Sequence, residues 1–148
     1  MMTHAREQIR DAIASELIGL TTTRKNVFTS RVHPITDNEL PCLLVFTRAE
    51  ASTLITMGQP RRIERDLTVM IVGCVKMNTA YDDKLDKIAV EVEQAIYNSA
   101  SLKATLHDIF LSDTEIELTG EAEKPVAMIS MSYVAKYHTL ENTPETIS

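Results

Sequence analysis

Histidine and cysteine are the residues of this sequence best suited to metal binding or nucleophilic chemistry. The four histidines lie in different predicted elements, and none has a second histidine three or four positions away, as a metal-binding pair on a helix requires. Cys42 and Cys74 lie inside apolar runs and lack CxxC spacing. We therefore predict two reduced, buried thiols, which fits a cytosolic protein.

Three carboxylates, Asp82, Asp83 and Asp86, could form a catalytic or Mg²⁺-binding cluster. They also begin a predicted helix, where the helix dipole stabilises negative charge, and we favour this interpretation. The four glycines form no GxGxxG or phosphate-binding loop. Tyr133 and Tyr137 share a strand face and could stack bases, but their apolar neighbours favour a core or interface role. We therefore expect no enzyme activity, no catalytic or metal-binding residue and no cofactor.

The elements that would position such residues follow from length and hydrophobic periodicity. The chain has 148 residues, a formal net charge of −6 and 44% hydrophobic residues. These values predict a single domain over residues 1–138, followed by a flexible tail at 139–148. The acidic balance argues against nonspecific nucleic-acid binding. We see no signal peptide, and no stretch approaches the ~20 apolar residues of a membrane span.

Apolar residues at helical spacing predict two main helices, at residues 3–19 and 79–98. Thr3 can cap the first helix and Gly19 can end it, while Asn78 or Thr79 can cap the second. Predicted strands lie at residues 27–32, 42–52, 61–75, 114–120 and 124–139. The order predicts an α+β fold, with a mixed, mostly antiparallel sheet of four to five strands and both helices packed on one face.

Two segments look suited to contacts with other proteins. In RRIERDLTVMIVGCV, residues 61–75, the arginines stand among Glu64 and Asp66 and form a mixed-charge ribbon, which is either a solvated strand end or a protein contact. The connection at 53–60 carries Leu54, Ile55 and Met57. These apolar side chains either lie against a partner or fold back over their own sheet.

Four stretches taken together resemble the tail-terminator family of long-tailed bacteriophages, also called minor tail protein U or tail completion protein. They are NELPCLLVFTRAEAS, RDLTVMIVGCV, YDDKLDKIAVEVEQAI and SMSYVAKYHT, and the likeness runs from about residue 3 to 139. The resemblance implies a structural protein of the virion, assembled in the host cytoplasm and located at the head-proximal end of the tail. Its copies would form a ring, usually a hexamer, that caps the tail tube, stops its polymerisation and provides the head-joining surface.

The implied partners are other copies of the chain, the tail tube protein and a head-completion or connector protein. DNA would pass through the lumen without specific binding, and no membrane would be involved. Because a ring needs two different matching patches, we expect opposite charges to meet in it. The expected contact residues are Arg48, Leu54, Ile55, Met57, Arg61, Arg62, Arg65, Glu115 and Glu117, with Glu121 and Glu123 extending the acidic patch. The alternatives are a head–tail joining protein, an injection-device cap, or a small ligand-binding domain or enzyme.

Overall fold

The computed structural model describes residues 3–29, 39–78, 80–119 and 125–148, and these residues form one sheet covered by helices. The strand order is β1-β2-β3-β5-β4. The strand bounds are β1 (Val27–Phe28), β2 (Cys42–Leu54), β3 (Arg62–Lys76), β4 (Asp108–Thr119) and β5 (Val126–Leu140). β1 runs parallel to β2, and the other neighbouring strands are antiparallel. The predicted α+β class and mixed, mostly antiparallel sheet are confirmed.

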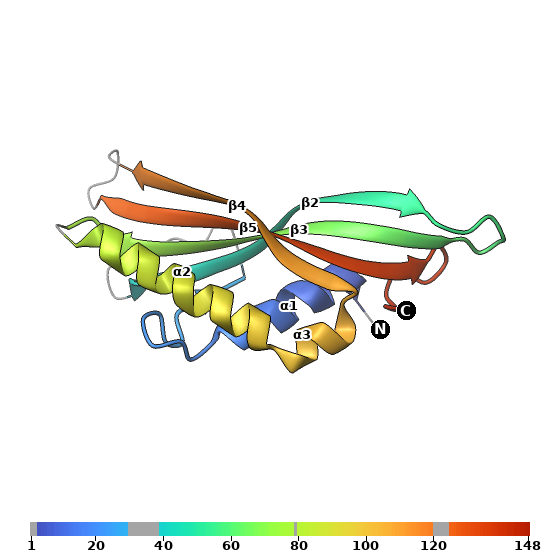
Figure 1. The fold of residues 1–148 in the computed structure, drawn as a ribbon, viewed down its shortest axis with the longest axis horizontal. Coiled ribbons are helices and arrows are strands. Elements are labelled where there is room, and N and C mark those ends of the chain that lie inside the picture. Colours follow the sequence, from blue (N-terminus) through green and yellow to red (C-terminus); the bar gives the residue numbers. More distant parts are fainter. Residues whose placement is uncertain (1–2, 30–38, 79, 120–124) are drawn as a thin grey trace.

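The helices α1 (Ala5–Leu17), α2 (Tyr81–Asn98) and α3 (Ala100–Thr105) lie on one face of the sheet (Figure 1). The apolar stripe of α2, formed by Leu85, Ile88, Val92 and Ile96, is buried against this face. We call it the helix-covered face and the opposite side the helix-free face. Packing the helices on one side leaves the helix-free face available for other contacts.

The pattern of buried residues along β3 shows how this strand contributes side chains to both faces of the sheet. From Leu67 to Ile71 every second residue is buried, and from Ile71 to Val75 every residue is buried. Gly73 faces α2, and a Cβ atom there would lie 2.9 Å from the Cγ2 atom of Ile88. The absence of a side chain at Gly73 therefore allows the helix to approach the sheet closely.

The helix caps differ from the predicted ones. His4, and not Thr3, caps α1, because its Nδ1 atom accepts a hydrogen bond of 3.1 Å from the backbone N–H of Arg6. Burial, followed by the charge of Arg6, lowers the pKa of His4, which favours the neutral imidazole that can accept this bond. Gly19 adopts the predicted positive φ of 96°. Ala80 occupies the N-cap of α2 without a side-chain bond.

Asn78 accepts a hydrogen bond from the N–H of Ala80 and so does not cap the first turn of α2, while residue 79 lies outside the described residues. β4 starts at Asp108, well before the predicted Thr114. A register shift between Leu111 and Asp113 breaks the alternation on which the prediction depended. The strand expected at 27–32 is observed at Val27–Phe28, and residues 30–32 are not described.

Candidate functional site

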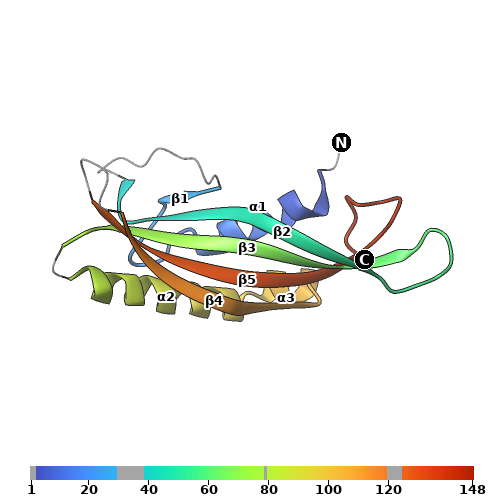
Figure 2. The same ribbon diagram turned by 90° about the horizontal axis from the view of Figure 1, so that it is seen from above.

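The hairpin formed by β2 and β3 extends beyond the helices (Figures 1 and 2). We call residues 51–66 the arm and residues 54–61 its tip. Ladder pairing continues to Leu54 and Ile63, so the arm is a regular extension of the sheet. Leu54, Ile55 and Met57 are 50%, 43% and 95% exposed. These side chains are therefore not covered by their own sheet, and their contact with a partner stays a prediction.

The base of the arm is held by a polar cluster on the helix-covered face, where the apolar core ends. The carboxylate of Glu50 accepts hydrogen bonds from the hydroxyl of Tyr137, from Arg6 at 2.7 Å and from Arg65 at 3.0 Å. Arg65 also donates through Nε to the hydroxyl of Thr139 at 3.0 Å. We call these five residues the arm-base cluster.

Hydrogen bonds and burial together set the protonation states in the arm-base cluster. Burial raises the pKa of Glu50, but the hydrogen bonds from Tyr137, Arg6 and Arg65 together outweigh burial and lower it below the usual value. Burial and the bond to Glu50 raise the pKa of Tyr137. Glu50 is thus ionised and Tyr137 is neutral at physiological pH, as an O–H donor to a carboxylate requires.

The three arginines of the mixed-charge ribbon have different surroundings. Arg65 is only 8% exposed and its partners lie within the chain, so we now interpret it as a residue that supports the arm. Arg61 bonds to both carboxylate oxygens of Glu141, at 2.7 and 3.0 Å, and this pairing holds the pKa of Glu141 below its usual value. Arg62 donates to the hydroxyl of Ser148 at 2.7 Å and has no carboxylate partner among the described residues.

Residues 141–148 return along the base of the arm. The backbone N–H of Ala5 donates to the carbonyl oxygen of Pro144 at 3.0 Å, and that of Ser148 donates to the carbonyl oxygen of His138 at 2.9 Å. Ile147 packs against the core. The flexibility expected for residues 139–148 stays a prediction, and these contacts are the ones that such motion would have to break.

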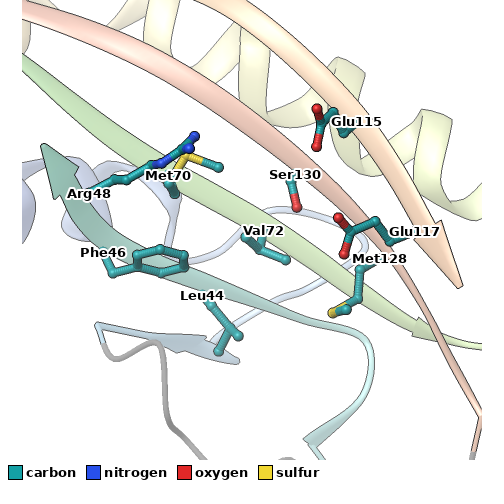
Figure 3. A pocket seen from close by; sticks show the side chains of 9 residues that line it. All are labelled: Leu44, Phe46, Arg48, Met70, Val72, Glu115, Glu117, Met128 and Ser130. Atoms are coloured by element: carbon teal, nitrogen blue, oxygen red, sulfur yellow. The ribbon is translucent and has the colours of Figure 1, made fainter. Parts of the chain in front are cut away.

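A groove lies on the helix-free face and crosses four strands (Figure 3). Its apolar lining comes from Leu44, Phe46, Met70, Val72 and Met128. Arg48 of β2 lies on one side, and Glu115 and Glu117 of β4 lie on the other. The structure thus brings together three predicted contact residues from strands that are not neighbours. Glu121 and Glu123 lie outside the described residues.

The residues considered for chemistry have other roles. Cys42 and Cys74 are buried free thiols, as predicted, and they face each other across β2 and β3. Tyr133 and Tyr137 are buried in the core beneath the helices, as favoured above. Asp82 and Asp83 occupy the first turn of α2. The described part of the chain contains no group of three His, Cys, Asp or Glu residues suited to a metal ion.

Sequence reasoning missed the arm-base cluster and the groove. The hairpin register pairs Ser52 with Arg65, which makes Glu50 a diagonal neighbour of Arg65. A register drawn from the turn near Gly58 could have predicted that pair. The groove offered no comparable signal, because it depends on β5 lying between β3 and β4.

None of the helices in the described residues is both long and apolar enough to cross a bilayer.

A comparison with known protein families agrees with the resemblance seen in the sequence. The family described as phage minor tail protein U matches residues 4–137. One similar solved structure is a chain of the "Virion of native gene transfer agent (GTA) particle", with 15% identity, a TM-score of 0.46 and 92% of each chain covered. No curated protein matches the chain. Since the family match includes every strand of the sheet except the end of β5, the chain belongs to the phage minor tail protein U family, a family of structural proteins of phage tails.

Proposed function

We propose that this protein caps the phage tail tube as a ring, with six copies as the expected number. The ring stops polymerisation of the tube and provides the surface to which the head joins. Family membership over residues 4–137 supports a role in the tail. The ring, its head-proximal position and its capping action come from the resemblance to tail terminators.

The observation that carries the proposal is the arm with its exposed aliphatic tip. A monomeric soluble protein rarely projects a cluster of aliphatic side chains into water, so such a cluster marks a contact surface. Leu54, Ile55 and Met57 are exposed, and they belong to the arm, which extends past the helices (Figure 2). An arm of this kind suits a protein that contacts neighbours in a larger particle.

The partners that we propose are other copies of this chain, the tail tube protein and a head-completion or connector protein. The contact residues are those at the tip and on the helix-free face, together with Arg61 and Arg62. They are Arg48, Leu54, Ile55, Met57, Arg61, Arg62, Glu115 and Glu117. DNA passes through the lumen without specific binding, and the net charge of −6 supports this because phosphate binding requires an excess of positive charge.

Electron microscopy of lysates made without this protein tests the capping action. We expect tails of irregular and excessive length, because nothing would end the growth of the tube. Supplying the intact protein from a second gene copy is the control, and it should restore a single tail length. Tails of normal length without the protein would contradict the proposal.

A head–tail joining protein remains the second candidate from the sequence, and binding separates it from a tail terminator. Purified protein would be incubated with tail tubes and, separately, with isolated head connectors. A terminator is expected to bind the tubes. Binding to connectors alone would favour the joining protein.

A further inference from the structure

The tip and the groove are two apolar surfaces of one chain that do not cover each other. The tip carries Leu54, Ile55 and Met57 at the far end of the arm. The groove lies over Leu44 and Val72, in the part of the sheet nearer to the start of β2. β2 pairs with β3 on both sides of a register shift between Thr47 and Ala49, and the pairing then runs to Leu54, so the tip cannot bend back to the groove without breaking β2–β3 pairing.

The groove is large enough to hold side chains of the tip. Its volume is about 520 Å³, within the range of about 300–1,000 Å³ typical of pockets that hold small molecules. The lining is chiefly apolar side chains with charged groups at the sides, which is the usual pattern of a protein interface, with an apolar centre and a polar rim. Figure 3 shows Val72 between Arg48 on one side and Glu115 and Glu117 on the other.

The charges of the two surfaces are complementary. Glu115 and Glu117 have no ion-pair partner among the described residues, and both lie on the β4 side of the groove. Arg62 lies at the base of the tip and is bound by a neutral hydroxyl, so within the described residues its charge is not neutralised. An arm entering the groove with Arg62 toward β4 would pair these charges, and such pairing sets the register of an interface.

We propose that the tip of one copy docks into the groove of a second copy, with Arg62 next to Glu115 and Glu117. This inference rests on the proposed ring. The contact joins two different patches, so each copy offers a tip to one neighbour and a groove to the other. Repetition of such a contact produces a closed ring when the rotation between copies closes.

Cysteine crosslinking tests the contact directly. Met57→Cys places a thiol at the tip, and Ser130→Cys places one in the groove with little change in side-chain volume. Under oxidation, a chain with both substitutions should give a ladder of covalent multimers on a non-reducing gel. Chains with one substitution should give dimers at most. The native cysteines are fully buried, and the unsubstituted protein controls for them.

A matched control replaces the groove position with an exposed position on the helix side. Val90→Cys in α2, combined with Met57→Cys, should give no multimers larger than dimers. The experiment uses purified protein at high concentration and tails isolated from virions. A ladder that forms equally well with Val90→Cys, or no ladder with Ser130→Cys in either sample, would overturn the docking proposal.

Charge exchange provides an independent readout. Arg62→Glu should weaken self-association by about tenfold or more, because it places like charges together. Adding Glu115→Arg and Glu117→Arg to the same chain should restore it, measured by sedimentation equilibrium. Failure of the combined variant to recover while all variants remain folded would count against the pairing.

The outcomes separate this inference from the proposed function. If rings form on tails and tail length depends on the protein, but tip and groove never crosslink, only the docking inference fails. If tail length is normal without the protein, the capping function fails, and a tip–groove ladder in the purified protein would still support the docking contact.

Discussion

Replacing Arg65 with methionine tests the interpretation of the arm-base cluster. The substitution keeps a long side chain but removes the guanidinium that bonds to Glu50 and Thr139. Arg62→Met is the matched control, because it removes a guanidinium from the same strand whose hydrogen-bond partner among the described residues is the hydroxyl of Ser148. The two variants differ in burial and in partners, while the chemical change is the same.

The expected loss in the free energy of unfolding of Arg65→Met depends on the hydrogen bonds that Glu50 keeps. Breaking a buried ion pair by removing one partner costs about 3–5 kcal/mol. Since Arg6 and Tyr137 still donate to the carboxylate of Glu50, we expect the lower end of that range, about 3 kcal/mol. In a chain of this length, a loss of that size corresponds to a fall in Tm of about 6–12 °C. Arg62→Met should change the free energy of unfolding by no more than about 0.5 kcal/mol.

Thermal unfolding followed by circular dichroism, together with urea denaturation, measures both variants against the unsubstituted protein. Equal Tm values for Arg65→Met and Arg62→Met would refute the reasoning, since it would mean that the buried guanidinium contributes no more than an exposed one. A loss of self-association in Arg65→Met at a temperature where the fold is intact would instead assign Arg65 to a partner contact.

Two further comparisons test the packing of the core and the charge of the arm-base cluster. Gly73→Ala should cost about 1–3 kcal/mol, because its Cβ would lie 2.9 Å from Ile88, whereas Gly58→Ala, with nothing within 4 Å, should unfold at or slightly above the Tm of the unsubstituted protein; equal Tm values would contradict the packing argument. Because the pKa of Glu50 is lowered in the folded state, its stabilisation is present above the unfolded-state pKa of about 4.3 and is lost as pH falls through the folded value. The free-energy gap between the unsubstituted protein and Glu50→Gln should therefore narrow from pH 7 to pH 3 in urea denaturation, and a constant gap would contradict the assignment.

Periodicity predicted most of the fold, because it reports which side of an element is buried. The alternation in β3 gave both its half-exposed start and its fully buried end, and the structure confirms both. Helix ends were predicted less well. His4 lies next to Thr3, and either residue offers an acceptor to the first turn, so tertiary contacts decided which one caps α1.

The candidate site depended more strongly on tertiary structure. Composition could predict the exposed side chains of the tip, because three aliphatic residues in a short connection between strands are too far from the core to be buried in it. It could not distinguish Arg65 from Arg62, because burial of Arg65 follows from the position of α1 and the pairing of β3 with β5. The groove likewise requires Arg48 and Glu115 to reach the same face from strands separated by two others.

The pairing of β3 with β5 has a consequence for how the protein is made. Every residue of β3 has a partner in β5, although α2, α3 and β4 lie between them in the chain. During translation β5 leaves the ribosome after the other four strands, so until then the β2–β3 hairpin has one unpaired edge and uncovered apolar side chains. Such long-range pairing is slow, and an uncovered edge invites aggregation. We expect the sheet to form completely only after β5 has been synthesised.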